Sequence, residues 1–139
     1  MSKKPKKCIS VKEARKLEKN YVETIEKTLK KELGCEECRE FWWSLEEIEE
    51  YIDYVKSEAK EKGYKNLGLR FYLGHYGKNK SKDNEQTTMF IAPTGVHAKE
   101  GLASIKGKTV GAMKAEADDN IYDIDAYNGA YGGVPPKKY

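Results

Sequence analysis

Two segments of this chain carry the same helix-start signal, and they predict a helical first half. The segments SVKE at residues 10–13 and SLEE at residues 44–47 both have the S-x-x-E spacing of a capping box. In such a box the serine hydroxyl accepts a hydrogen bond from the glutamate N–H, and the glutamate side chain accepts one from the serine N–H. Each box opens a segment of helical period that ends at a glycine, Gly34 or Gly63. The spacing therefore predicts helices over about residues 11–33 and 45–62.

Both predicted helices carry an apolar stripe at steps of three and four residues. The first stripe is Ala14, Leu17, Tyr21, Ile25 and Leu29. The second stripe is Leu45, Ile48, Ile52, Val55 and Ala59, with Tyr51 and Tyr54 at its flanks. Trp43 and Ile48 have the spacing of a hydrophobic staple at the start of the second helix. The connector between the helices is short, so we expect them to be neighbours.

The hydrophobic period then changes to two, which is typical of β-strands. Leu67, Leu69, Phe71 and Leu73 alternate with other residues, which predicts a strand with one buried face. Residues 87–92 predict a second strand that stops at Pro93, and residues 121–126 predict a third. Residues 109–117 fit either a short helix or a strand.

Together these elements predict an α+β fold. We expect an N-terminal antiparallel helical hairpin packed on a small, mainly antiparallel sheet, followed by a Gly/Tyr/Pro-rich C-terminal tail. The predicted organisation is a basic flexible arm over residues 1–8, a single α+β domain over residues 9–126, and an extended tail over residues 127–139.

The composition indicates a modest core and a heavily charged surface. Charged residues make up 35% of the 139 residues, and the net charge is only +3. No apolar segment approaches the ~20 residues of a membrane helix, and the basic start lacks the hydrophobic region of a secretory signal. Three cysteines are an odd number, which favours a reducing compartment. We therefore expect a cytoplasmic protein with no membrane contact.

Several motifs resemble functional sites incompletely. Cys35 and Cys38 form a C-x-x-C motif, but the two glutamates between them disfavour a thiolate, and a zinc site needs two further ligands. Cys8, His75 and His97 match no standard zinc spacing. Gly107-Lys108-Thr109 resembles the end of a P-loop, but Gly101 lies six residues before Gly107, whereas a P-loop requires five. The acidic segment at 118–125 lacks the glycine and glutamate positions of an EF-hand. We therefore expect no metal, no cofactor and no catalytic site.

The favoured interpretation is a non-catalytic protein that binds another protein or a second copy of itself. It rests on segregated charge, exposed-aromatic candidates and the tail. Tyrosine and tryptophan provide large contact areas at protein interfaces. The candidate protein-binding residues are Trp42, Arg70, Tyr72, Tyr127, Tyr131 and Tyr139.

Two other interpretations remain open. The first is a nucleic-acid-binding protein that uses the basic arm and a basic loop, Lys3, Lys4, Lys6, Lys7, Lys78, Lys80 and Lys82. The acidic segment over residues 36–53 argues against it, because phosphates are repelled by carboxylates. The second is a small thiol-dependent or metal-dependent enzyme that uses Cys35, Cys38 or a histidine.

Overall fold

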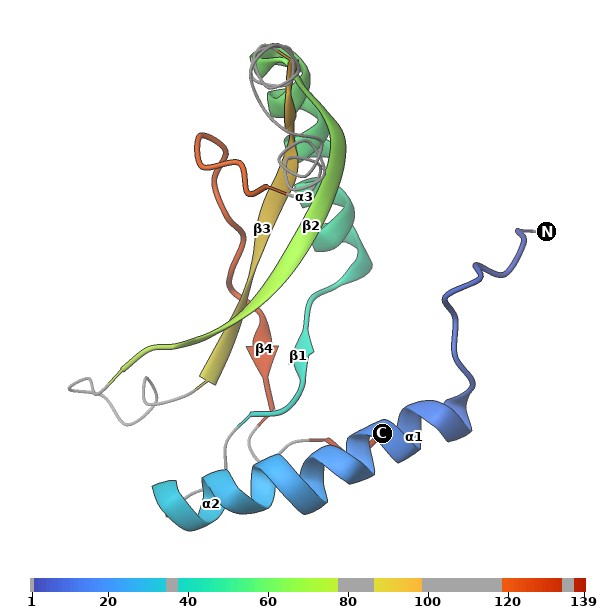
Figure 1. Ribbon diagram of the computed structural model, residues 1–139, viewed down its shortest axis with the longest axis vertical. Helices are drawn as coiled ribbons and strands as arrows, with labels where there is room; N and C mark the ends of the chain where they lie inside the picture. Colours follow the sequence, from blue (N-terminus) through green and yellow to red (C-terminus); the bar gives the residue numbers. More distant parts are fainter. Residues whose placement is uncertain (1, 35–37, 78–86, 99–118, 134–136) are drawn as a thin grey trace, which may run out of the picture. The chain divides into compact units, whose positions relative to one another are not determined.

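The computed structural model describes residues 2–34, 38–77, 87–98, 119–133 and 137–139. Two compact units make up the chain, Met1–Glu40 with Gly132–Tyr139, and Phe41–Tyr131; we call them unit 1 and unit 2. A long N-terminal helix, a second helix and two two-stranded sheets confirm the predicted α+β class (Figure 1).

The helix of unit 1 runs from Val11 to Leu33, as the first capping box predicts. It comprises α1 (Val11–Tyr21), a π-helical turn η1 (Val22–Glu26) and α2 (Lys27–Leu33). The backbone N–H of Ser10 donates to Glu13 at 2.7 Å, and the N–H of Glu13 donates to the Ser10 hydroxyl at 3.1 Å. Gly34 ends the helix in the left-handed conformation, with φ of 71°, which glycine adopts without a steric penalty.

The π turn is a feature that the sequence pattern did not predict. Thr24 and Thr28 donate their hydroxyls to the carbonyls four residues earlier, at 2.5 and 3.1 Å, and such side-chain bonds compete with the helical ladder. A π turn inserts an extra residue and rotates the following side chains around the axis. The predicted stripe is not buried along its length: Leu17, which precedes the π turn, and Ile25, which lies within it, are both exposed.

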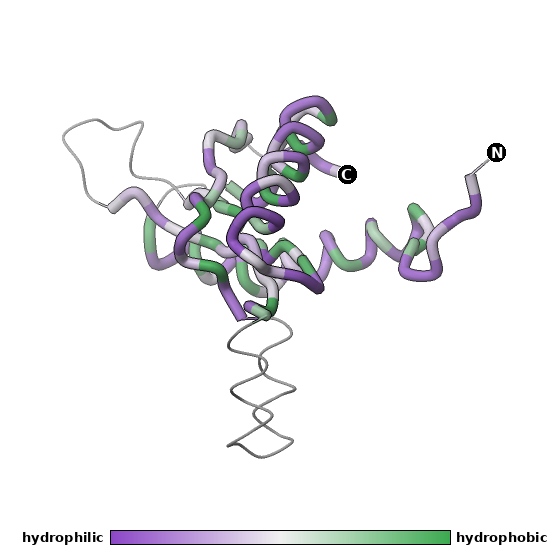
Figure 2. Tube along the Cα trace, turned by 90° about the horizontal axis from the view of Figure 1, so that it is seen from above, coloured by the Kyte–Doolittle hydropathy of each residue, from purple (hydrophilic) through white to green (hydrophobic). Residues whose placement is uncertain are grey.

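Unit 2 is built from the second helix and a long β-hairpin. The helix α3 (Leu45–Lys62) starts at the Ser44 capping box and ends at Gly63, as predicted. The strands β2 (Tyr64–His75) and β3 (Thr87–His97) pair antiparallel. A second, small sheet pairs β1 (Phe41–Trp42) with β4 (Tyr131–Gly132). Hydrophobic and hydrophilic residues alternate around the helices (Figure 2).

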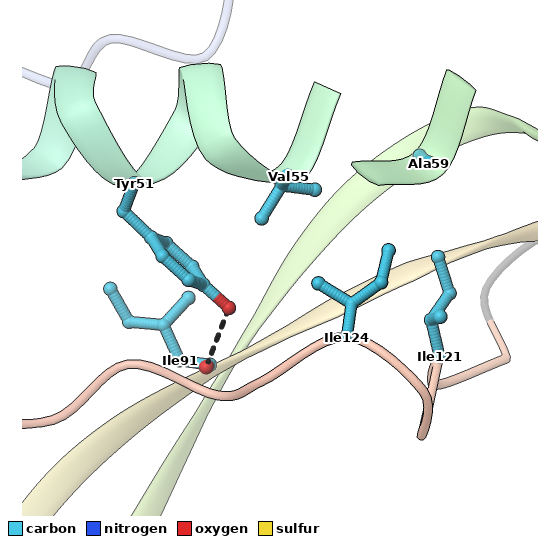
Figure 3. Packing of buried hydrophobic residues seen from close by; sticks show 6 residues of the cluster. All are labelled: Tyr51, Val55, Ala59, Ile91, Ile121 and Ile124. Atoms are coloured by element: carbon cyan, nitrogen blue, oxygen red, sulfur yellow. Dashed lines mark hydrogen bonds between the residues drawn. The ribbon is translucent and has the colours of Figure 1, made fainter. Parts of the chain in front are cut away.

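The core of unit 2 lies between α3 and the hairpin. Tyr51, Val55 and Ala59 project from one side of α3 at four-residue spacing, and they pack against three isoleucines (Figure 3): Ile91, Ile121 and Ile124. The predicted stripe was therefore displaced on the helix, because Tyr51 is central to the core and Leu45 is 76% exposed. Trp43 and Ile48 both pack against this core, as the staple spacing indicated.

The prediction that Pro93 stops the second strand was wrong, since Pro93 is buried within β3. Its carbonyl accepts the N–H of Ile121 at 2.8 Å, so the backbone groups of this residue face away from β2. Proline lacks an N–H, and it is tolerated in a sheet where no ladder bond needs that donor. The ladder between β2 and β3 therefore loses nothing at Pro93.

The predicted third strand over residues 121–126 was also wrong, because this segment forms turns and bends. It still returns along β3, through single bridges from Asn120 to Thr94 and from Tyr127 to Ile91. Between the bridges, the turn brings Ile121 and Ile124 to the same side, and both are buried. A spacing of three suits a turn and does not fit a strand, in which these side chains would point to opposite faces.

We predict that Tyr51→Phe destabilises the protein and alters its alkaline unfolding. The Tyr51 hydroxyl donates to the Asp125 carbonyl at 2.9 Å and lies 3.3 Å from the Ile91 carbonyl, so its loss costs about 1 kcal/mol at neutral pH. Burial, with Tyr54 and Asp125 nearby, raises the pKa of Tyr51 to about 12. The unfolded chain ionises first, so stability falls as the pH rises from about 10 toward 12.

Urea unfolding from pH 7 to 12 measures both effects. In Tyr51→Phe the fall above pH 10 should be shallower than in the wild type. Tyr131→Phe is the matched control, because Tyr131 is 77% exposed and its hydroxyl has no hydrogen bond to the described residues. An alkaline fall of unchanged slope in Tyr51→Phe would contradict this assignment.

A second prediction concerns the start of α3. Ser44→Ala removes the acceptor for the Glu47 N–H at 3.0 Å, and it should lower the free energy of unfolding by about 1 kcal/mol. Ser57→Ala lies inside the same helix at an exposed position and should be neutral or slightly stabilising. Thermal denaturation followed by circular dichroism compares the two; equal midpoints would show that the box contributes nothing.

Candidate functional site

The backbone of β3 makes hydrogen bonds on both of its sides. Ile91 both donates to and accepts from Tyr127, at 2.8 and 2.9 Å, and Gly95 donates to Asp119 at 3.0 Å. With Pro93, three alternate residues of β3 thus direct their backbone groups away from β2 and toward the returning segment 119–127. The residues between them therefore form the ladder with β2, because successive residues of a strand point their N–H and C=O groups to opposite sides.

The register of the hairpin determines which residues of β2 point their backbone groups away from β3. Phe71 lies opposite Ile91, Leu69 opposite Pro93, and Leu73 opposite Met89. These three residues of β2 occupy non-hydrogen-bonded positions of the hairpin, so their N–H and C=O groups point outward, away from β3. Within the described part of the chain no partner meets these groups. Figure 1 shows β2 with β3 on one side and no further labelled strand on the other.

The side chains along this edge are apolar and partly uncovered. Leu69 packs against the core, whereas Phe71 is 54% exposed and Leu73 is 65% exposed. Leu67, on the same strand, is also exposed. The prediction of a buried face was therefore only partly right. On the face of the hairpin that packs on α3, Ile91 of β3 is fully buried, whereas Phe71 and Leu73 of β2 stay exposed. We call the outward backbone groups of Leu69, Phe71 and Leu73, with the exposed side chains of Leu67, Phe71 and Leu73, the β2 edge surface.

The β2 edge surface lacks the features that usually protect a free strand. Natural edges are blunted by charged side chains, prolines or bulges. In β2 the irregularity lies between Lys65 and Gly68, at the Leu67 end of the edge surface and before the outward residues Leu69, Phe71 and Leu73. Arg70 is the only charged residue from Gly68 to Leu73, and its side chain lies on the opposite face of the sheet by alternation. An unprotected, apolar edge is the kind of surface to which another strand can add.

The opposite face of the hairpin carries a polar network around Asn120. The side-chain Oδ1 of Asn120 accepts a hydrogen bond from Arg70 Nη1 at 2.8 Å, and the side-chain Nδ2 of Asn120 donates one to the Tyr72 hydroxyl at 2.7 Å. The bond from Asn120, with Arg70 nearby, lowers the pKa of Tyr72. The Tyr72 ring stacks on Phe90 with centroids 5.1 Å apart. Arg70 and Tyr72, both predicted as binding residues, thus hold the returning segment against the hairpin; the sequence offered no signal for Asn120.

The predicted aromatic residues of unit 2 have different environments. Tyr127 stacks on Tyr51 with centroids 4.7 Å apart and packs beside Trp43, whose indole N–H donates to the Asn128 carbonyl at 3.1 Å. The segment predicted as a tail from Tyr127 therefore begins within unit 2. Trp42, in β1, and Tyr131, in the paired strand β4, are 59% and 77% exposed.

In unit 1 the end of the chain lies against the helix. The backbone N–H of Tyr139 donates to both carboxylate oxygens of Glu18 at 3.0 Å, and its side chain is 58% exposed. Arg39 bonds Glu26 at 2.7 Å and lies 3.5 Å from Glu18. Burial acts to lower the pKa of Arg39, but the bond with Glu26 and the charges of Glu26 and Glu18 outweigh it and raise the pKa. Both carboxylates are thus ion-paired with Arg39, whose buried Nε lies 3.5 Å from Glu18 and has no hydrogen-bond partner among the described residues.

The residues of the other two interpretations do not assemble into a site within the described part of the chain. Cys8 is exposed and Cys38 is buried, and Cys35 lies outside the described residues. His75 and His97 lie at opposite ends of the hairpin. No group of three metal-ligating side chains is present among the described residues.

Of the lysines of the nucleic-acid interpretation, only the arm group lies within the described residues. The arm lysines, Lys3, Lys4, Lys6 and Lys7, are exposed at the start of unit 1. The loop lysines, Lys78, Lys80 and Lys82, lie outside the described residues. The described residues therefore neither join the two basic groups nor separate them.

The helices in the described part of the chain include none with the length and apolar character required to cross a bilayer. In comparisons with known proteins, no family model, no curated protein and no solved structure matches this chain.

Proposed function

We propose that this chain is a non-catalytic protein-binding protein, and that its partner binds by adding a strand to the β2 edge surface. The proposal rests on one observation. The residues of β2 whose backbone groups point outward are also the residues whose apolar side chains α3 leaves partly uncovered: Leu69, Phe71 and Leu73. Strand addition uses the backbone for affinity and alternate side chains for specificity.

The expected energies require both parts of this surface. Three outward residues present six backbone groups, and each hydrogen bond contributes about 0.5–1.5 kcal/mol net. Covering Phe71 and Leu73, which are about half exposed, contributes up to about 1.5–3 kcal/mol each. Association costs an estimated 4–15 kcal/mol in lost freedom of motion. The hydrogen bonds together contribute about 3–9 kcal/mol and the two side chains up to about 3–6 kcal/mol, so both contributions are needed to span the estimated cost.

The exposed aromatic residues Trp42 and Tyr131 support the same class of function. Both residues belong to unit 2 and lie on the paired strands β1 and β4, and aromatic residues of this size are common anchors at protein interfaces. Tyr127, by contrast, is engaged with Tyr51 and Trp43 and is not part of the proposed surface.

The proposal predicts which position captures a partner. A photoreactive phenylalanine analogue in place of Phe71, in cells that make the protein, should crosslink to a polypeptide. The matched control is the same analogue at Tyr122, which is 90% exposed on the returning segment of unit 2. Adding Leu73→Lys to the Phe71 probe should abolish the adduct, because a lysine blocks strand addition at an edge. No adduct at position 71 above the Tyr122 control would refute the proposal.

A further inference from the structure

We infer that the strand added to β2 is the β2 of a second copy of this chain, paired antiparallel about a two-fold axis at Phe71. This inference rests on the proposed function and names its partner. It follows from the register of β2, from the alternation of inward and outward backbone groups along this strand, and from the position of Arg70, the charged residue at its centre.

The alternation of backbone groups along β2 allows this pairing. Outward groups must meet outward groups, and in β2 these belong to Leu69, Phe71 and Leu73. Placing the axis at Phe71 sets Phe71 opposite itself and Leu69 opposite Leu73 of the other copy. All three outward residues then find partners from the same set. In an antiparallel pair, directly opposed side chains lie on the same face, so the apolar row of one copy continues into the row of the other.

The neighbouring registers are less complementary. An axis at Arg70 would set the two Arg70 side chains directly opposite each other, and opposed like charges destabilise a sheet. An axis at Tyr72 would set Leu69 opposite His75. The axis at Phe71 instead sets Arg70 opposite Tyr72 of the other copy, which suits a cation–π contact. It also sets Gly68 opposite Gly74, where no side chain obstructs the approach of the two strands.

The matching apolar rows favour a second copy as the occupant, and the position of Arg70 favours the axis at Phe71 over the axis at Arg70. A two-fold axis makes the same surface serve both partners, which is the commonest arrangement in homo-oligomers. The product is a four-stranded sheet in the order β3, β2, β2, β3. It covers Phe71 and Leu73 of both chains with a surface of matching character.

A single cysteine at the axis tests the inference directly. Opposed residues of a hydrogen-bonded antiparallel pair have Cα atoms about 5.5 Å apart, which is within the range of about 4.4–6.8 Å for disulfides. In a background of Cys8→Ser, Cys35→Ser and Cys38→Ala, Phe71→Cys should form a covalent dimer under mild oxidation. Leu69→Cys alone should not, but it should crosslink to Leu73→Cys when the two variants are mixed. Tyr122→Cys, on an exposed side chain, is the control for random collision.

A second measurement does not depend on cysteine. Light scattering of the wild-type chain should give the mass of two chains, and Leu73→Lys should weaken the dimer about tenfold or more through the lost apolar contact. Tyr122→Lys should leave the dimer intact, and circular dichroism should show that both variants are folded. Amide exchange by NMR should show protection of Phe71 and Leu73 that rises with protein concentration, while Arg70 and Tyr72 are protected throughout.

The outcomes separate this inference from the proposed function. A monomeric wild type, with no Phe71→Cys dimer and no concentration-dependent protection, overturns the second copy as the partner. If the photoreactive probe at Phe71 then captures a different polypeptide, strand addition stands with a foreign partner. If it captures nothing, both proposals fail. Crosslinking of Leu69→Cys to itself would overturn the axis at Phe71.

Discussion

The architecture of unit 2 depends on the hydrogen bonds between β3 and the returning segment 119–127. These bonds occupy the far side of β3 at alternate residues, from Ile91 to Gly95. They position Ile121 and Ile124 over the core, and they bring the Asp125 carbonyl to the Tyr51 hydroxyl. The same bonds determine, through the alternation of the strand, that the outward groups of β2 belong to its apolar residues.

The returning segment explains how unit 2 is stabilised by a small core. The described core has six buried hydrophobic side chains, and two of them come from the returning segment and not from the hairpin or α3. Without that segment, α3 and a two-stranded hairpin would form an incomplete layer, and isolated hairpins are marginal in water. The Asn120 network on the other face of the hairpin attaches the start of the segment through Arg70 and Tyr72.

The parts of the fold that the sequence predicted are those encoded locally. Capping boxes and terminal glycines are short-range signals, and both helices begin and end where those signals lie. The strand alternation likewise located the hairpin. The errors concern contacts between distant segments: Pro93 is tolerated because of Ile121, and Tyr51 is central because Asp125 and Ile91 lie within reach of its hydroxyl.

The candidate site divides in the same way. The row from Leu67 to Leu73 was evident in the sequence, but its exposure depends on where α3 ends its coverage. The outward direction of its backbone follows from the bonds of Ile91 with Tyr127, 36 residues farther along the chain. Trp42, Tyr131 and Tyr139 are exposed as a binding role requires, whereas Tyr127 is held in the core by its stacking on Tyr51.

The two sides of the hairpin are therefore unequal, and this inequality limits how far any assembly can grow. On the β3 side, the chain itself occupies the outward backbone groups from Ile91 to Gly95, and Pro93 lacks a donor that an incoming strand would need. A sheet that can extend in one direction only is complete after a single symmetric addition. If strands add at β2 as proposed, association ends in a closed particle of two chains, whereas a hairpin with both sides open can polymerise into a fibre.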